Sequence, residues 1–569
     1  MDDRSTYDLK SIRLPRFAGI ALRLFIFLIE SPATRWLLLG NLLKQGGITS
    51  MRAMRFDEAP TFLPRFSVDP KQQPRKTAAR ELGERPLARL APKTSGWRFP
   101  SVADYAKAYR TKSSTPLEVA ERVLDAMHRS NAQEPPLRAM IAYNRDDILT
   151  QANASALRHK RGRPLSVLDG VPIAVKDEMD LVPYPTKVGT RFMGTGPAKE
   201  DATIAARLRA AGALLIGKAN MHEIGIGVTG HNPHNGTARN PYNLGHYTGG
   251  SSSGPASATA AGLCPAALGA DGGGSIRFPA AFCGLVGLKT TFGRTSSFGA
   301  APLSWSNDQL CPIGACTADV ALLYLLTAGP DPRDPNTLAQ PHLSLEGLER
   351  RDLRGIRLGV YWPWFEHATP SVVAACKEML EALTARGARV VEVVIPELEA
   401  GRVGHIVSIT SEMAAAQERY WPKHWKEYSY EVRTNLTLAR SFTARDYLQA
   451  LRARTRVTAN FMTALEHVDA IVTPTTACVA PRIPADALPD GDSDLTTLLQ
   501  IMRFAPVANF TGLPAISFPA GYDSEGMPIG FQAIGRPWQE HVLLRLAQVG
   551  ESVVERRKPQ LFFPLLGEE

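Results

Sequence analysis

The feature that most restricts the fold is a run of small residues between Gly249 and Arg294, which begins GGSSSGPASATAAGLCPAALGADGGGSIRFPAAFCG. A Gly/Ser loop at 249–254 leads into a segment of Ala, Ser and Thr, which we expect to form a helix. A short strand is expected at 264–269, before a second glycine loop. Side chains this small let neighbouring backbones approach closely, so the run predicts a densely packed α/β core.

The second glycine loop indicates acyl-transfer chemistry. Gly272, Gly273 and Gly274 follow one another, and their backbone N–H groups are free to converge on an anion. That anion is either a phosphate or the oxyanion of an acyl-transfer intermediate. A phosphate loop needs the GxxxxGK[ST] spacing, which is absent. The hydroxyl of Ser275, directly after the glycines, therefore favours acyl transfer with Ser275 as the nucleophile.

A serine nucleophile needs a base, and Lys176 is the candidate. The sequence has no Gly-x-Ser-x-Gly elbow around this serine. We expect structural or surface roles for His222, His231, His234 and His246, which lack a metal-ligand spacing. Lys176 directly follows an apolar, strand-like segment at 166–175. A lysine at the end of a buried strand is unusual, because a buried unpaired ammonium is costly. The alternative is a lysine paired with Asp177, Glu178 or Asp180.

Helix and strand signals alternate through the rest of the chain. Thr115-Pro116 and Thr369-Pro370 are typical helix starts. We expect a helix that begins at Asp201 and ends at Gly212. Buried strands are predicted at 213–216, 389–395 and 470–473. This order predicts an α/β fold with a mixed or mainly parallel sheet.

The N-terminal part differs from the rest. Residues 1–47 contain two apolar runs, at 17–29 and 36–43, each shorter than the roughly 18–20 residues that cross a bilayer. They suit a peripheral membrane contact through residues 17–43, a dimer contact, a lid over an apolar channel, or ordinary packing on the core. The start of the chain does not resemble a signal peptide.

Residues 48–96 are rich in Arg and Pro and predict an extended linker. Positions 51–100 hold 8 Arg and 3 Lys against 2 Asp and 3 Glu, so 11 − 5 = +6 of the net +10 lies there. The remainder is nearly balanced, which argues against a nucleic-acid partner. Six cysteines without a CxxC pair argue against a disulfide scaffold or a cysteine zinc site, and suit an intracellular, reducing compartment.

Taken together, Lys176, the Gly249-Gly250-Ser251-Ser252 loop and the 272–277 segment resemble the amidase signature family. The spacings are 275 − 251 = 24 and 251 − 176 = 75. The resemblance implies a single large domain at 97–560, with a mixed β-sheet flanked by helices. It also implies that Lys176 is the base, Ser251 a bridging serine after a cis peptide bond, and Ser275 the acyl-bearing nucleophile. The oxyanion hole and substrate contacts would come from Gly272, Gly273, Gly274, Ser275 and Ser252.

Within the family, the Ser-Ser-Ser-Gly loop and the N-terminal region resemble the plant-type fatty acid amide hydrolases. The resemblance implies hydrolysis of a lipid-like amide, such as an N-acylethanolamine, by a homodimer that needs neither a metal nor an organic cofactor. It implies a cytoplasmic or peripheral membrane location. The alternatives are the ammonia-releasing subunit of a glutamine-dependent amidotransferase and a generic short-chain or aryl amidase. We expect the channel walls to draw on the N-terminal helices and on residues 400–510.

Two further residues near the nucleophile are predicted to be structural. Arg277 is expected to pair with an acidic neighbour such as Asp271; the alternative is a contact with a substrate carboxylate. Cys283 is expected to pack as a small buried hydrophobe.

Overall fold

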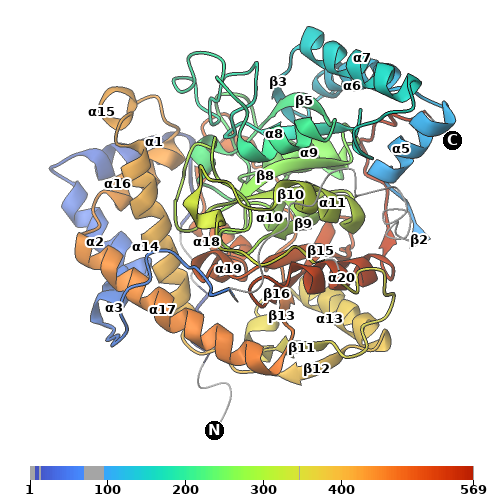
Figure 1. Cartoon of the computed structure of the whole chain (residues 1–569). Coiled ribbons are helices and arrows are strands. Elements are labelled where there is room, and N and C mark those ends of the chain that lie inside the picture. The colour runs from blue at the N-terminus through green and yellow to red at the C-terminus, as the bar shows by residue number, and fades with distance from the viewer. Residues whose placement is uncertain (1–6, 12–14, 69–94, 345, 568–569) are drawn as a thin grey trace.

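A computed structural model describes residues 7–11, 15–68, 95–344 and 346–567 (Figure 1). An 11-stranded mixed sheet runs through the molecule in the order β12-β11-β13-β16-β15-β9-β10-β8-β4-β5-β3. Its strands are β3 (Met140–Ala142), β4 (Pro172–Lys176), β5 (Leu214–Ala219), β8 (Ala266–Asp271), β9 (Val286–Lys289), β10 (Gln309–Gly314), β11 (Arg357–Val360), β12 (Arg389–Glu392), β13 (Ala470–Pro474), β15 (Ala515–Tyr522) and β16 (Pro528–Gly535).

The sheet has parallel pairs towards both ends and antiparallel ladders in its middle, and β3 adds an antiparallel edge strand beside β5. β4 pairs in parallel with β5 and β8 on one side, and β11 with β12 and β13 on the other. Strands β10, β9, β15 and β16 join these flanks through antiparallel ladders. Both faces are covered, because the central strands are buried along their whole length. The predicted mixed α/β sheet is therefore confirmed.

Helices flank this sheet, and further helices pack beside it on one side of the molecule. They are α1 (Gly19–Glu30), α2 (Arg35–Gln45), α3 (Ile48–Ala53), α5 (Val102–Thr111), α6 (Pro116–Asn131), α7 (Arg145–Lys160), α8 (Thr203–Ala210), α9 (Ser253–Ala260), α10 (Arg277–Phe282), α11 (Thr317–Thr327), α12 (Trp362–Phe365), α13 (Pro370–Ala385), α14 (Leu398–Gln417), α15 (Trp421–His424), α16 (Tyr430–Ala439), α17 (Ala444–His467), α18 (Leu495–Ile501), α19 (Pro506–Phe510) and α20 (Glu540–Glu551). Short two-stranded pairs are β1 (Phe17–Ala18) with β14 (Asp492–Ser493), β2 (Ser95–Gly96) with β17 (Glu555–Arg556), and β6 (Arg239–Asn240) with β7 (Asn243–Tyr247).

Several predicted boundaries are wrong for local reasons. The strand expected at 166–175 is β4 alone, because residues 166–169 form a turn closed by the Asp169 N–H on the Ser166 carbonyl (3.2 Å). Asp201 does not cap α8: its carboxylate pairs with Arg209 at 2.6 Å instead. The helix predicted from Thr115-Pro116 does form, as α6, with a complete capping box.

The N-terminal helices lie against α14, α16 and α17 at the left of Figure 1. An ion pair between Glu30 and Arg433 (2.5 Å) joins α1 to α16. α3 lies within the predicted linker, and residues 54–68 then cross the surface in an extended conformation. Residues 69–94 of that linker lie outside the described residues. Across the part of the chain that the structure describes, each helix is too short or too polar to cross a membrane.

Candidate active site

The sheet brings two of the predicted site segments to one edge. β4 and β8 are parallel neighbours, with Val175 opposite Leu268, so their carboxyl ends open on the same side. Lys176 is the last residue of β4. β8 ends at Asp271, and the glycine loop carries the chain from there to Ser275. The Ser251 loop, between β7 and α9, is the third segment.

Lys176 contacts both a serine and a carboxylate. Its Nζ donates to the Oγ of Ser251 at 2.9 Å and lies 3.1 Å from Oε1 of Glu178. The lysine side chain is 1 % exposed and that of Glu178 7 %. The ion pair with Glu178, which the sequence offers as the alternative to a base, is thus present together with the contact to Ser251. The peptide bond before Ser251 is cis.

The two serine loops are joined through their backbones. The N–H of Ser252 donates to the carbonyl of Ser275 at 3.3 Å, and the carbonyl of Ser251 accepts the N–H of His222 at 3.1 Å. The hydroxyl of Ser252 is turned inward, where it donates to the carbonyl of Ala270 at 3.1 Å. Ser252 therefore holds the loop by its side chain, and that side chain is buried away from the pocket described below.

A buried acid–base network shapes the glycine loop. Asp271 accepts from the N–H of Gly274 (2.6 Å) and pairs with Arg277 (2.9 Å) and Asn509 (3.0 Å). Burial opposes ionisation of Asp271, but the Arg277 guanidinium outweighs it and holds the pKa of Asp271 well below its usual range. The predicted pairing of Arg277 with Asp271 is present. The N–H group of Gly274, which the resemblance assigns to the oxyanion hole, therefore already donates to Asp271 within the loop.

The N–H groups of Gly272, Gly273 and Ser275 make no hydrogen bond within the described residues. These three residues line the pocket. Gly274 has a φ of +125°, and a Cβ there would lie 2.1 Å from the ring of Phe278, so only glycine fits.

His405, on α14, supports the same loop from outside the motif. Its Nε2 lies 2.8 Å from the carbonyl of Gly272. Burial lowers the pKa of His405 to about 4, so the ring is neutral and donates through Nε2–H to this carbonyl. A Cβ on Gly273 would lie 2.9 Å from the same ring. His405 therefore fixes the position of the first two glycines.

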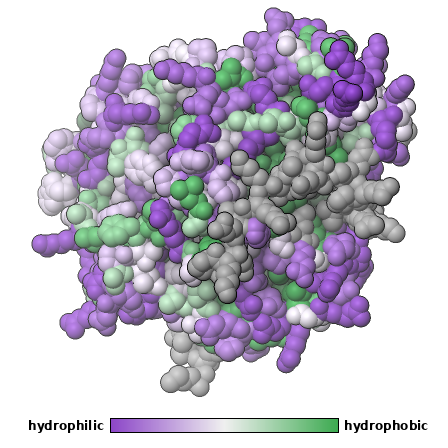
Figure 2. Space-filling view, in the orientation of Figure 1, coloured by the Kyte–Doolittle hydropathy of each residue, from purple (hydrophilic) through white to green (hydrophobic). Residues whose placement is uncertain are grey.

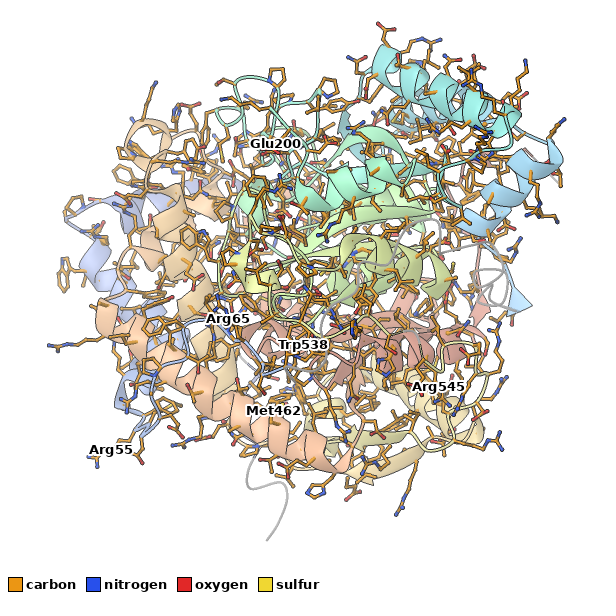
Figure 3. All side chains as sticks on the ribbon, in the orientation of Figure 1. Arg55, Arg65, Glu200, Met462, Trp538 and Arg545 are labelled. Carbon is orange, nitrogen blue, oxygen red and sulfur yellow. The ribbon has the colours of Figure 1, made fainter. Side chains whose placement is uncertain are left out.

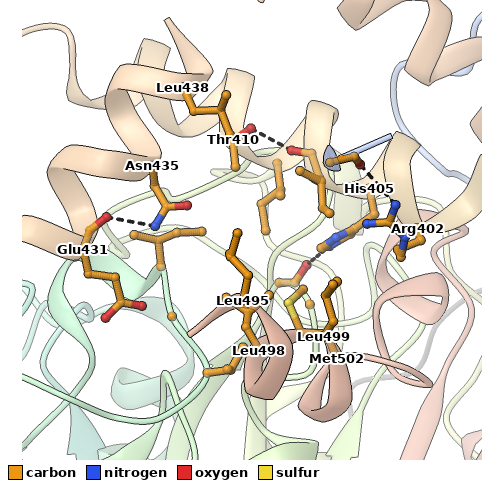
Figure 4. A pocket seen from close by; sticks show the side chains of 18 of the residues that line it. Arg402, His405, Thr410, Glu431, Asn435, Leu438, Leu495, Leu498, Leu499 and Met502 are labelled. Atoms are coloured by element: carbon orange, nitrogen blue, oxygen red, sulfur yellow. Dashed lines mark hydrogen bonds between the residues drawn. The ribbon is translucent and has the colours of Figure 1, made fainter. Parts of the chain in front are cut away.

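A mainly apolar pocket opens onto Ser275 (Figure 4). Its empty volume, including the mouth, is about 1140 Å³. Leucine, isoleucine and methionine side chains from α2, α3, α14, α16, α18 and the residue after α18 form its walls: Leu42, Ile48, Ile406, Ile409, Leu438, Leu495, Leu498, Leu499 and Met502. The polar side chains in the wall include Gln45, Arg402, His405, Thr410, Glu431 and Asn435. The pocket draws on the N-terminal helices and on residues 400–510, as expected.

A second, more polar pocket lies at Glu178, the ion-pair partner of Lys176. It is lined by Glu178, Asp308, Arg333 and Asp334, among others, and has an empty volume of about 1230 Å³. The Oδ1 of Asp308 lies beside Gly272, since a Cβ on that glycine would be 2.0 Å away. Burial raises the pKa of Asp308 to about 7, and the neighbouring Glu178 acts in the same direction.

The other predicted residues have structural surroundings. Cys283 is buried. His222 pairs with Glu431 at 3.2 Å and His234 with Glu223 at 2.8 Å, while His231 bonds to the Pro489 carbonyl at 2.9 Å. His246 is buried as well. In the described ranges, no group of three or more His, Cys, Asp or Glu side chains is arranged to hold a metal ion.

Known proteins share this fold. A family model described as Amidase matches residues 121–544. The chain belongs to the amidase signature family, and it is an amide-hydrolysing enzyme.

Among its relatives, a fatty acid amide hydrolase of Medicago truncatula is 39% identical over 589 residues, which cover 99% of this chain and 96% of the relative. A glutamyl-tRNA(Gln) amidotransferase subunit of Chloroflexus aggregans is 34% identical over 80% of this chain and 97% of its own. The crystal structure of an amidase superposes with a TM-score of 0.71 at 31% identity, over 80% of this chain and 99% of that one.

Sequence reasoning missed His405 and the residues of the pocket wall. His405 is 133 positions from the glycine it supports, and no local pattern marks it. Glu431, on α16, was missed for the same reason. The polar pocket was missed too, although Glu178 was among the acids considered as partners of Lys176.

Proposed function

We propose that the chain hydrolyses fatty acid amides, such as N-acylethanolamines, through a Lys176–Ser251–Ser275 relay and an acyl-enzyme. The observation that carries the proposal is the apolar pocket that ends at Ser275. A long acyl chain in this pocket is removed from water, at about 0.8 kcal/mol for each buried methylene. The similarity to plant fatty acid amide hydrolases extends over nearly the whole chain, including the N-terminal helices that contribute to the pocket.

The relay moves one proton out and back. Neutral Lys176 takes the proton of Ser251, which takes that of Ser275, as the Ser275 Oγ bonds to the amide carbon. The N–H groups of Gly272, Gly273 and Ser275 stabilise the oxyanion, and each such donor is worth about 3–4 kcal/mol. The C–N bond then breaks, and the proton returns through Ser251 to the leaving nitrogen. Water hydrolyses the acyl-enzyme by the same route.

A substrate panel tests the proposal. The purified enzyme is offered N-acylethanolamines of increasing chain length, short aliphatic amides, aryl amides and glutamine. We expect kcat/KM to rise with acyl chain length. A preference for short or aryl amides would instead identify a generic amidase. Glutamine hydrolysis without long-chain activity would favour the amidotransferase alternative, whose relatives align with 80% of this chain.

The proposal includes peripheral membrane contact through residues 17–43. The outer faces of α1 and α2 expose Ile20 (84%), Phe27 (68%) and Trp36 (70%), with Leu24 and Leu37 beside them. Figure 2 shows hydrophilic residues over most of the visible face, with hydrophobic residues at the left edge, on the side of these helices. Apolar helices in this setting suit the interface of a bilayer, from which a lipid-like substrate would enter.

Vesicle binding tests this contact. Replacing Ile20, Phe27 and Trp36 by Ser is expected to abolish co-sedimentation with phospholipid vesicles and to leave hydrolysis of a water-soluble amide unchanged. Sedimentation velocity of the same proteins tests the predicted homodimer. If the triple substitution dissociates a dimer and vesicle binding persists, the exposed face is a dimer contact and the membrane proposal fails. The intracellular location stays a prediction.

A further inference from the structure

Glu178 is the second group that contacts the Lys176 amine. The chain turns after β4, with the N–H of Met179 on the carbonyl of Lys176 (3.2 Å). This turn places the Glu178 carboxylate against the amine, 3.1 Å from it. Within the described residues, Oε1 of Glu178 makes no hydrogen bond, so its interaction with the ammonium is mainly that of one charge with another.

The other charged groups around Lys176 have partners of their own or lie behind Glu178. Asp177 accepts the N–H of Gly189 (2.9 Å) and faces Lys218 at 3.7 Å. Lys218 in turn donates to the carbonyl of Met179. Asp308, from the loop before β10, accepts the N–H groups of Leu303 and Ser304 and faces both Lys176 and Glu178.

Glu412, on α14, is the remaining acid near this cluster. It accepts from Ser304, Ser306 and Tyr447 at 2.8, 2.5 and 2.9 Å. Its charge is therefore used to hold the 304–308 loop. Glu178 remains the carboxylate in direct contact with the amine.

The two pockets separate the substrate from this carboxylate. Ser275 lines the apolar pocket, whereas Glu178 and Asp308 line the polar one. A fatty acyl chain in the apolar pocket would exclude water on its side, while Glu178 stays at the wall of the polar pocket. The Glu178 carboxylate lies 3.1 Å from the buried amine, in the place of a counterion for its protonated form, whereas the neutral amine is the form that accepts a proton from Ser251.

We propose that Glu178 is a positioning residue whose carboxylate is the counterion of the Lys176 ammonium, and that it thereby sets the pH at which hydrolysis begins. This inference rests on the proposed function, in which Lys176 is the base. The carboxylate keeps the buried lysine in place in the resting enzyme, at the cost of activity at low pH. Glu178 lines the polar pocket, whereas Ser275 lines the apolar one.

The test is the pH dependence of kcat/KM in Glu178→Gln, which keeps the shape of the side chain and removes its charge. We expect the acid limb of the profile to move to lower pH by about one unit or more, with KM for a long-chain amide unchanged; one unit is a tenfold change in the proton-binding equilibrium. Glu178→Asp keeps the charge, so its acid limb is expected close to that of the wild type. Glu200→Gln is the matched control, because Glu200 is 60% exposed and lies on the outside of the molecule (Figure 3).

Labelling of Ser275 by a fluorophosphonate gives a second readout if Glu178→Gln turns over too slowly. Its rate is expected to show the same shift of the acid limb. An unmoved limb in Glu178→Gln, or no labelling at any pH in a variant whose circular dichroism is native, overturns the inference. Failure of the proposed function looks different: the wild type would not hydrolyse long-chain amides, or Ser275→Ala would still be labelled.

Discussion

At the residue scale, the proposed relay depends on Ser251, which lies 2.9 Å from the Lys176 amine and whose neighbour Ser252 is bonded to the Ser275 backbone. A lysine at the end of β4 and a serine from a loop 75 residues further along the chain are thus held in hydrogen-bond contact by the sheet and by backbone hydrogen bonds. Such preorganisation lowers the barrier because the groups need not be brought together during the reaction. The two hydroxyls have different parts in the proposed relay, so their removal has different consequences.

Ser275→Ala is expected to abolish turnover, because the Oγ that bonds to the acyl carbon is lost. Removal of a serine nucleophile typically lowers kcat by about 10⁶-fold. Ser251→Ala is expected to keep a small residual activity, since a water in the space of the hydroxyl carries the proton. Steady-state kinetics with a fatty amide measure both variants. Equal and mild losses would contradict the assignment of these serines.

His405→Leu is expected to lower kcat by about tenfold, with KM little changed. The substitution removes the Nε2–H donor that holds the carbonyl of Gly272 at 2.8 Å. The oxyanion donors then lose part of the roughly 3–4 kcal/mol that a well-placed N–H contributes. His405→Gln offers an amide N–H to the same carbonyl and is expected to recover part of the rate. If the Leu and Gln variants behave alike, the ring acts only by filling space.

The sequence predicts the residue types of this site better than their bonds. Lys176, Ser251 and Ser275 stand out because each has an unusual local setting: a strand end or a glycine loop. The inward turn of the Ser252 hydroxyl depends on the Ala270 carbonyl, and the use of the Gly274 N–H depends on Asp271. These contacts arise from tertiary packing, so local sequence patterns do not specify them.

At the element scale, the apolar pocket is built by helices from both ends of the chain. α2 contributes Leu42, α14 contributes Ile406 and Ile409, and α18 contributes Leu495 and Leu498. The alternation of helix and strand was predictable from hydrophobic periodicity and capping residues, as α6 and α13 illustrate. That α2 and α18 line the same pocket was not predictable from the sequence. Periodicity indicates which face of a helix is buried, but not which other element covers that face.

Leu42→Trp is expected to shorten the acyl chain that the pocket accepts. The larger ring takes the space of about two methylenes, worth about 0.8 kcal/mol each, so kcat/KM for the longest amides should fall by about tenfold. Hydrolysis of a short-chain amide should not change. Leu157→Trp is the matched control, since Leu157 lies on α7, outside the proposed membrane contact, and is 53% exposed. Equal losses for long and short substrates would place Leu42 outside the acyl path.

At the scale of the whole molecule, we expect catalysis through Lys176 and the contribution of buried acids to stability to respond to pH in opposite directions. Hydrolysis through a neutral lysine is favoured at alkaline pH. Stability is reduced there by buried acids such as Asp319, at the start of α11. Its Oδ1 accepts the N–H of Val102 at 3.0 Å, which joins α11 to α5. Burial raises the pKa of Asp319 to about 8, so ionisation in the folded chain is unfavourable.

The consequence for stability follows from proton binding. In the unfolded chain, Asp319 titrates near its ordinary value of about 3.9. Between about pH 4 and pH 8, the folded chain therefore binds the extra proton, and the free energy of unfolding falls as the pH rises through this window. Asp319→Asn stays uncharged and still accepts the Val102 N–H. We expect its Tm to exceed that of the wild type by more at pH 9 than at pH 5, by roughly 1 °C for each kcal/mol of stability in a chain of this length.

Differential scanning calorimetry at the two pH values measures this effect, with Asp125→Asn as the control at an exposed aspartate of α6. The control should shift Tm equally, and little, at both. An Asp319→Asn protein with the same Tm difference from the wild type at pH 5 and pH 9 would show that this carboxyl is ionised in the fold. If the expected result holds, one uncharged substitution at the contact between α5 and α11 stabilises the protein at alkaline pH, where we expect hydrolysis through Lys176 to be fastest.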